Sequence, residues 1–317
     1  MELVLTYSLG RGNPEPWRYF RACVMLNAAD IIAGRGSAER PSCPSLWVDS
    51  GGYQLLTGGL GVLSVREVVE AQASLRPDYA VMPDDPRSPE RCLERYGEYA
   101  ELASEAGLRA EPVPVVHTTW KWPLVWRLRE ELDFRILAVG GVARGLGRPF
   151  RIRAAAALLA FIWRLRQAMR GVKLHVLGVG GPSLMPALAA LNVASVDTAS
   201  WIHDARYGIV RVGARAYTVK RKDCDKLPRL PRDFECSCPA CREDPEALWH
   251  TGLEGLRARA LHNAYNLLRL SRELACLPRD PWELASRLGE KGLLSVVARA
   301  LLREVRRLEE GAPPALQ

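Results

Sequence analysis

The chain has 317 residues, of which 48% are hydrophobic and 25% are charged. This composition excludes a largely disordered chain, and no stretch reaches the roughly 20 apolar residues that a membrane-spanning helix needs. The formal net charge of +8 favours a polyanionic partner such as a nucleic acid, although an arginine-rich surface without that role would give the same balance. The first residues, MELVLTYSLG, have no basic leader, so we expect a cytoplasmic protein with no membrane partner.

Short apolar runs followed by turn signals recur along the chain and are typical of buried parallel strands. Amphipathic stretches typical of helices lie between most of them. This alternation predicts an α/β fold, namely a compact (β/α)8 TIM barrel formed by residues 1–222. The expected strands are 3–7, 46–48, 79–82, 113–116, 136–139, 174–177 and 195–196, and the expected helices are 65–73, 89–105, 120–131, 149–169 and 183–191.

The pattern changes near residue 223. Residues 223–275 join a segment rich in proline, cysteine and charge to a stretch, 248–274, with the pattern of one or two helices. We expect a small metal-binding subdomain here, with a helix that completes the barrel. Residues 276–317 are predicted to form a C-terminal helical segment.

Three of the eight cysteines, Cys236, Cys238 and Cys241, are clustered in the sequence CSCPAC. In a cytosolic chain such a cluster is more typical of a metal site than of disulfides. His262, in a predicted helix, would complete a Cys3His set, which is the closed tetrahedral pattern of structural Zn²⁺. His250 is the competing fourth ligand, and a coincidental cluster of cysteines is the alternative interpretation.

Three acidic residues follow predicted strands. Asp49 opens the sequence DSGGYQ, Asp84 follows the strand at 79–82, and Asp197 closes the strand at 195–196. The C-terminal ends of barrel strands carry active sites, so we expect these carboxylates at one rim. One carboxylate acting as nucleophile and another as acid/base would suit glycosidic exchange through a covalent sugar–enzyme intermediate. Each acid alone could equally cap a helix or a loop.

Other residues near these strand ends could contact a planar ligand. Tyr53 offers a flat face on which a base can stack. Gly140 and Gly141 would leave room for such a ligand, although a simple turn needs them equally. The glycine run at 178–182 has neither the lysine of a phosphate-binding loop nor the spacing of a dinucleotide fingerprint, so we expect no nucleotide cofactor.

These motifs occur together and in one order: DSGGYQ, an acid after an apolar strand, VGG, LGVGGP, VDTAS, and CSCPAC with a helical histidine. The succession, over roughly residues 45–270, resembles the tRNA-guanine transglycosylase family, and its archaeal branch most closely. The resemblance implies a (β/α)8 barrel with a Cys3His zinc subdomain. It also implies a pentosyltransferase that replaces a guanine in tRNA with a 7-deazaguanine such as preQ0. Its partners would be tRNA, the free base and a second copy of the chain in a homodimer.

The resemblance also implies a role for each site residue. Asp197 would be the nucleophile at the ribose C1′, and Asp49 the general acid/base. Asp84 would bind the purine edge and Tyr53 would stack on the base. The remaining implied substrate-binding residues are Gln54, His117, Gly140 and Gly141, and the implied zinc ligands are Cys236, Cys238, Cys241 and His262. Basic residues that could hold the nucleic-acid backbone are Arg206, Arg211, Arg215, Lys220 and Arg221.

The chain departs from the family pattern at His117-Thr118, where the family usually has Gln-Gly. This departure leaves open which base enters. Residues 278–317 are too few for the RNA-binding domains of the archaeal members. DNA, the substrate of a compact branch of the same superfamily, is therefore the alternative to tRNA. A catalytically silent partner subunit is a further alternative, which the presence of both Asp49 and Asp197 disfavours.

Overall fold

The computed structural model describes residues 1–9, 12–35, 39–52, 63–85, 88–141, 152–219 and 227–274. Tyr53, Gln54, Lys220 and Arg221, for which the sequence predicts substrate contacts, lie outside the described residues, as does the segment 276–317. No helix within the described ranges is long and apolar enough to cross a membrane.

Nine parallel strands of the described chain form one sheet, in the order β5-β4-β3-β2-β1-β9-β8-β7-β6. Neighbours in this order are mostly neighbours in the chain, as expected when strands alternate with helices. The strands are β1 (Glu2–Thr6), β2 (Cys23–Asn27), β3 (Leu46–Asp49), β4 (Tyr79–Val81), β5 (Glu111–Val113), β6 (Val115–His117), β7 (Ile136–Gly140), β8 (Lys173–Val176) and β9 (Ser195–Thr198).

The two edges of this sheet are parts of one segment of chain. Strand β5 pairs with β4, strand β6 pairs with β7, and only Pro114 separates β5 from β6. Proline has no N–H to donate, so it interrupts the ladder at this point. The continuous segment 111–117 therefore closes the ring as its eighth strand, and the predicted (β/α)8 barrel is confirmed. The single strand predicted at 113–116 needs correction, because Pro114 divides it.

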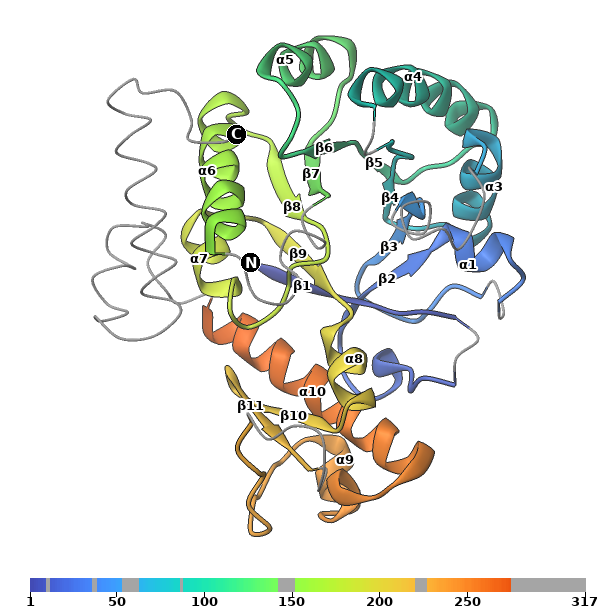
Figure 1. Cartoon of the computed structure of the whole chain (residues 1–317). Helices are drawn as coiled ribbons and strands as arrows, with labels where there is room; N and C mark the ends of the chain where they lie inside the picture. The colour runs from blue at the N-terminus through green and yellow to red at the C-terminus, as the bar shows by residue number, and fades with distance from the viewer. Residues whose placement is uncertain are drawn as a thin grey trace.

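Helices surround the strands, as Figure 1 shows. Helix α3 illustrates how their ends are set: Ser64 caps its first turn, and Glu67 bonds back to the Ser64 N–H. The helices around the barrel are α1 (Ala28–Ile32), α3 (Val65–Leu75), α4 (Pro89–Glu105), α5 (Trp122–Glu131), α6 (Ile152–Ala168), α7 (Met185–Ala190), α8 (Ser200–Arg206) and α10 (Gly252–Leu274).

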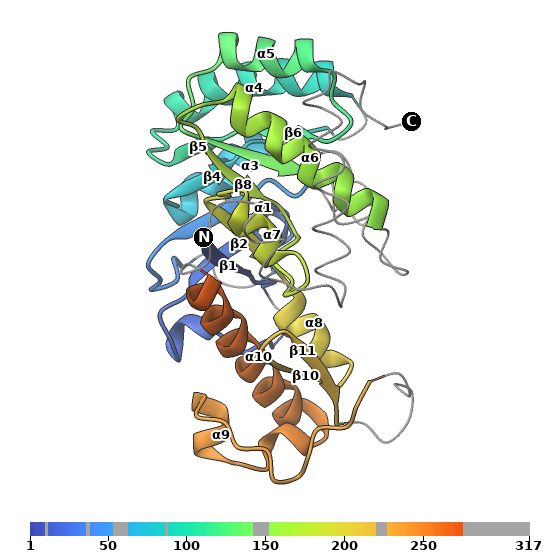
Figure 2. The same cartoon turned by 90° about the vertical axis from the view of Figure 1, so that its left-hand side faces the viewer.

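A small unit lies at the end of the molecule opposite α5 (Figures 1 and 2). It contains an antiparallel hairpin of β10 (Ile209–Val212) and β11 (Arg215–Thr218), and the short helix α9 (Pro239–Glu243). Its own apolar cluster joins Val210 of the hairpin to Cys238, Leu248 and Leu261. Helix α10 packs against both this unit and α8, so it connects the small unit to the barrel.

The inside of the barrel is apolar at its centre and polar at one end. Val4, Met25, Trp47 and Val115 belong to a buried cluster within the ring. Side chains alternate along a strand, so the residue two positions further on faces the same way. Two positions after each of these four apolar residues, the strand carries a polar residue that also points inward. The inward polar residues at the C-terminal ends of the strands are Thr6, Asn27, Asp49, His117 and, from β9, Asp197.

Candidate active site and metal centre

Three carboxylates meet at the C-terminal ends of the barrel strands. Asp49 ends β3, Asp197 lies in β9, and Asp84 follows β4. The charges of Asp84 and Asp197 both act on Asp49, which requires the three groups to lie near one another. The structure therefore brings together the acids that the sequence predicts at one rim.

Asp197 is buried and accepts hydrogen bonds at both carboxylate oxygens. Its Oδ1 accepts the Gly178 N–H at 2.7 Å and lies 3.3 Å from Nε2 of His175. Its Oδ2 accepts the Thr6 hydroxyl at 2.6 Å. Donors of this kind stabilise the charged form of a carboxylate, which is the form that a nucleophile requires.

Asp49 lies in a different environment. Its Oδ2 accepts from Asn27 Nδ2 at 3.2 Å and from the Gly51 N–H at 3.3 Å, and both bonds are long. Burial, followed by the negative charges of Asp84 and Asp197, raises the pKa of Asp49 to about 7. A carboxyl group with this pKa can give and take a proton near neutral pH, as acid/base catalysis needs.

Asp84 forms a buried pair with His117. Nε2 of His117 lies 2.8 Å from Oδ2 of Asp84, and both residues are less than 10% exposed. The carboxyl group of Asp84 also lies over Gly52, where a Cβ would come within 2.3 Å of Oδ1. Gly52 is thus the residue that makes room for Asp84.

Gly140 and Gly141 lie against the imidazole of His117. A Cβ on Gly141 would lie 2.5 Å from Nδ1 of His117, and one on Gly140 would lie 3.2 Å from its Cε1. Gly141 also has a φ of +74°, which L-residues with a side chain rarely adopt. These glycines and His117, all predicted to contact substrate, therefore form one wall.

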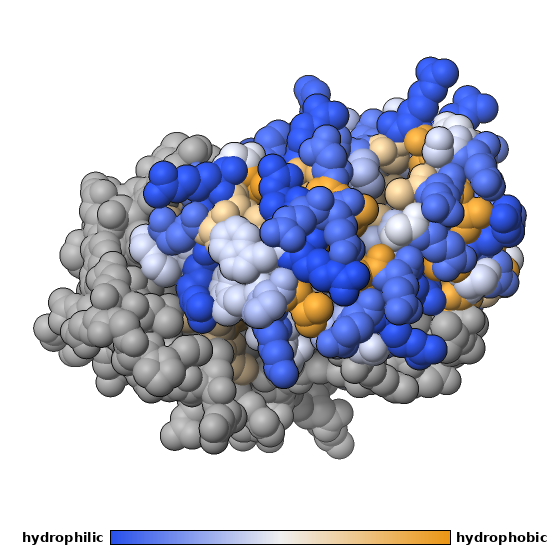
Figure 3. All heavy atoms as spheres, turned by 90° about the horizontal axis from the view of Figure 1, so that it is seen from above, coloured by the Kyte–Doolittle hydropathy of each residue, from blue (hydrophilic) through white to orange (hydrophobic). Residues whose placement is uncertain are grey.

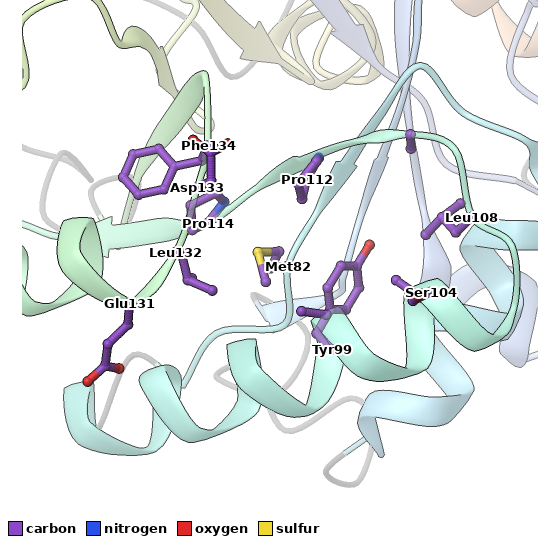
Figure 4. Close-up of a pocket in the computed structure, with 13 residues that line it drawn as sticks. Met82, Tyr99, Ser104, Leu108, Pro112, Pro114, Glu131, Leu132, Asp133 and Phe134 are labelled. Atoms are coloured by element: carbon purple, nitrogen blue, oxygen red, sulfur yellow. The ribbon is translucent and has the colours of Figure 1, made fainter.

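One cavity beside the barrel is separate from this site. A cavity of about 420 Å³ lies outside the strand ring, between α4 and the segment 131–134 (Figure 4). It is lined by the outer faces of Pro112 and Pro114 and by Met82 and Tyr99, and none of the three carboxylates borders it. The surface on the α4 and α5 side is largely hydrophilic, with apolar residues visible between the polar ones (Figure 3).

The structure also brings the four predicted metal ligands together. One ligand atom from each of Cys236, Cys238, Cys241 and His262 lies within 4.8 Å of all the others, and the last three residues are buried. Backbone N–H groups point at the sulfurs of Cys236 and Cys238. These four residues could hold a metal ion.

The imidazole of His262 is oriented for this role. Its Nε2 donates to the Arg211 carbonyl oxygen at 2.8 Å, so that in the neutral ring Nδ1 is the nitrogen that can bind a metal. Nδ1 faces Cys238 and Cys241, at 3.6 and 3.5 Å from their sulfurs. His250, the competing ligand, instead pairs with Asp244 and is 42% exposed at its side chain.

Of the basic residues expected to hold a nucleic-acid backbone, Arg211 is engaged within the protein. Its guanidinium pairs with Asp204 at 2.6 Å. Arg206 contacts Asn13 Oδ1 at 3.2 Å, and Arg215 is exposed on β11.

Three polar residues that contact the carboxylates at the C-terminal ends of the barrel strands were not identified from the sequence: Thr6, Asn27 and His175. Each contacts one of the two carboxylates at the ends of β3 and β9. Thr6 and Asn27 are the last residues of their strands, and this position is the one signal that could have identified them. The Ser50 hydroxyl is also buried at this end and has no hydrogen-bond partner among the described residues.

Comparison with known proteins gives consistent matches. The model of the family described as queuine tRNA-ribosyltransferase matches residues 45–275. The chain is 30% identical to the tRNA-guanine(15) transglycosylase of Aeropyrum pernix over 283 residues, which are 83% of this chain and 52% of that protein. It is 28% identical to the protein of the same name from Saccharolobus solfataricus over 249 residues, 70% of this chain and 46% of that one. The chain thus spans about half the length of these curated relatives.

Proposed function

The chain belongs to the queuine tRNA-ribosyltransferase family, and on this premise we propose that it is a tRNA-guanine transglycosylase that replaces a guanine of tRNA with a 7-deazaguanine. The observation that carries the proposal is the meeting of three carboxylates at one end of the barrel, two of them in contrasting environments. Asp197 receives three hydrogen-bond donors, whereas the pKa of Asp49 is raised to about 7. Contrasting environments of this kind are typical of a nucleophile paired with an acid/base group.

In the first half of the proposed reaction, the Asp197 carboxylate attacks C1′ of the target nucleotide. The C1′–N9 bond breaks, its electron pair goes to the leaving guanine, and protonated Asp49 gives that guanine a proton. An ester between Asp197 and the ribose results. The nucleotide must leave its base stack to reach the buried Asp197.

In the second half, a 7-deazaguanine enters the position that guanine has left. Ionised Asp49 takes the N9 proton of this base, N9 attacks C1′, and the ester bond to Asp197 breaks. Asp197 is released as a carboxylate and Asp49 is again protonated. The two halves therefore need Asp49 in opposite protonation states, which a pKa of about 7 allows at neutral pH.

We propose that Asp84 and His117 bind the edge of the base. Asp84 has one oxygen turned toward His117 and the other over Gly52, so that the latter can accept an N–H of a purine. Gly140 and Gly141 leave room for the imidazole of His117, which a side chain at either position would displace.

The Cys3His cluster fits Zn²⁺, which prefers tetrahedral sulfur and nitrogen ligands. Four protein ligands would leave no position for a substrate, so the proposed role of the metal is structural. Cys236 and Cys238 come directly before α9, Cys241 lies within it, and His262 comes from α10. Such an ion would hold the small unit onto the helix that joins it to the barrel.

A base-exchange assay tests the proposed function. The full chain is incubated with labelled guanine and either total tRNA or duplex DNA, and the label in each polymer is counted. We expect label in tRNA, and we expect unlabelled preQ0 added later to displace it. Label in DNA alone would contradict the tRNA substrate, and label that preQ0 cannot displace would contradict a 7-deazaguanine as the incoming base.

The covalent intermediate is tested separately. Rapid denaturation of the protein with tRNA in the absence of a second base should trap a protein–RNA adduct. Asp197→Ala should form none, and Asp49→Asn should form it slowly. An adduct of unchanged amount with Asp197→Ala would show that another residue is the nucleophile.

A further inference from the structure

His175 is a buried histidine inside the barrel that the reaction above does not use. It lies in β8, directly opposite Ser195 of β9 in the strand register, and its exposed fraction is 0%. A side chain without exposed surface cannot touch a nucleic acid or a free base. His175 can therefore affect the reaction only through a residue that it contacts, and one of these residues is Asp197.

Contacts on several sides fix the ring of His175. Its Nδ1 lies 2.8 Å from the Ser195 hydroxyl, and its Nε2 lies 3.3 Å from Oδ1 of Asp197. Its face stacks on Trp47, with ring centroids 4.5 Å apart and planes inclined by 26°. Trp47 is itself stacked on Tyr79 at 4.2 Å. Stacking and hydrogen bonding together leave the imidazole a single orientation, with Nε2 toward the carboxylate.

The two oxygens of Asp197 therefore differ. Oδ1 accepts the backbone N–H of Gly178 at 2.7 Å and faces Nε2 of the fixed ring of His175. In the tautomer with the hydrogen on Nε2, in which Nδ1 accepts from the Ser195 hydroxyl, both groups are donors and neither can turn away. Among the described residues, Oδ2 accepts one hydrogen bond, from the Thr6 hydroxyl at 2.6 Å, whose hydrogen can rotate to another acceptor. Oδ2 can thus be freed for attack, whereas Oδ1 stays bonded throughout.

We propose that His175 is a positioning residue that, together with the Gly178 N–H, holds Oδ1 of Asp197 so that Oδ2 is the oxygen that attacks the ribose. This inference rests on the proposed function. The new bond is C1′–Oδ2, the C1′–N9 bond breaks with its electrons going to guanine, and Oδ1 becomes the carbonyl oxygen of the ester. In the second half the same donors stabilise the carboxylate as it leaves C1′.

The test compares His175→Phe, which keeps a flat ring on Trp47 but has no nitrogen, with His175→Gln, which keeps an N–H donor. For each full-length variant we measure the single-turnover rate of adduct formation at saturating tRNA, together with kcat and KM. We expect His175→Phe to slow adduct formation by about 10- to 100-fold, because small misplacements of a reacting group have effects of this size. The KM values should stay within about twofold. His175→Gln should recover much of the rate.

Two further variants separate positioning from stability. Ser195→Ala removes the partner of Nδ1 and should slow adduct formation less than His175→Phe does. Val176→Ala is the matched control: it is equally buried and adjacent in β8, but it belongs to the apolar cluster outside the ring. It should lower the melting temperature and leave the adduct rate unchanged below that temperature. If His175→Phe does not fold, His175→Gln and Ser195→Ala still give the comparison.

The outcomes are distinct. Adduct formation at the wild-type rate in His175→Phe, with none in Asp197→Ala, would overturn the role of His175 and leave the proposed function intact. An equal loss of rate in Val176→Ala would also overturn it, because general loosening of the strand would then explain the effect. A wild-type protein that forms no Asp197-dependent adduct would instead overturn the proposed function.

Discussion

Nε2 of His117 lies 2.8 Å from Oδ2 of Asp84, and the two side chains are buried together where the barrel opens. Removing one member of a buried pair leaves the other without its partner, at a cost of about 1–3 kcal/mol. In the proposed base-binding site, Asp84 would also lose the partner that orients its carboxyl group toward the base. His117→Ala should therefore raise the KM for the incoming base by about tenfold or more, with a smaller fall in kcat. Steady-state kinetics at varied base concentration measures both, and an unchanged KM for the base would contradict the assignment.

The substitution Gly141→Ala adds a methyl group beside His117 and so tests the same part of the site by the opposite change. In Gly141→Ala the new Cβ would meet Nδ1 of His117 at 2.5 Å, at a φ of +74° that alanine rarely adopts. We expect weaker base binding and a lower melting temperature. Gly181→Ala is the control, because its Cβ would meet nothing within 4 Å. Equal effects of the two substitutions would show that the wall beside His117 has no special part in binding.

The raised pKa of Asp49 predicts opposite pH dependences for the two halves of the reaction. Burial, ahead of the charges of Asp84 and Asp197, raises its pKa to about 7. Adduct formation needs the protonated form and should slow as the pH rises through about 7. Transfer to the incoming base needs the ionised form and should speed up over the same range. Single-turnover rates of each half, taken over about 1.5 pH units on either side of that pKa, measure this directly. Two parallel profiles would exclude Asp49 as the shared acid/base.

The same shift predicts a stability effect. The folded protein holds a proton on Asp49 up to about pH 7, whereas the unfolded chain loses it near the ordinary pKa of 3.8. The folded state thus binds more protons between these values, so Asp49 makes the protein less stable as the pH rises from about 3.8 to 7. Asp49→Asn removes this loss, and its melting temperature should exceed that of the wild type at pH 8. The difference should shrink toward pH 4, and a difference that is constant with pH would refute the shift.

Much of this site could be predicted from the sequence because its acids directly follow apolar strands. Asp49 and Asp197 each follow an apolar run, and although either acid alone could cap a helix or a loop, a parallel barrel gathers such strand ends at one rim. Strand β2 could not be predicted in the same way. Its residues CVMLN run into helix α1 with no turn residue between them, so apolar periodicity does not separate the two elements. Missing that strand also meant missing Asn27, its last residue.

The contacts of Asp197 could not be predicted for another reason. His175 and Thr6 reach it only because β8 and β1 are the strands that pair with β9 on its two sides. Apart from the position of Thr6 at the end of its strand, nothing in KLHV or ELVLT distinguishes these residues from ordinary core or surface positions. Their significance depends on strand register, which local sequence specifies weakly when both faces of a strand are buried.

The Cys3His cluster predicts that stability depends on a metal. The purified chain should contain about one equivalent of zinc, because its three sulfurs and one imidazole nitrogen form a closed tetrahedral set. A strong chelator should remove the metal and lower the melting temperature, since metal binding contributes directly to folding of the small unit. His262→Ala should lose the metal, whereas His250→Ala should keep it, because His250 pairs with Asp244 away from the cluster. Cys43→Ala, a cysteine outside the cluster, is the matched control for loss of a thiol. Metal retained by His262→Ala and lost by His250→Ala would mean that the fourth ligand has been misassigned, and a protein that binds no zinc at all would refute the centre.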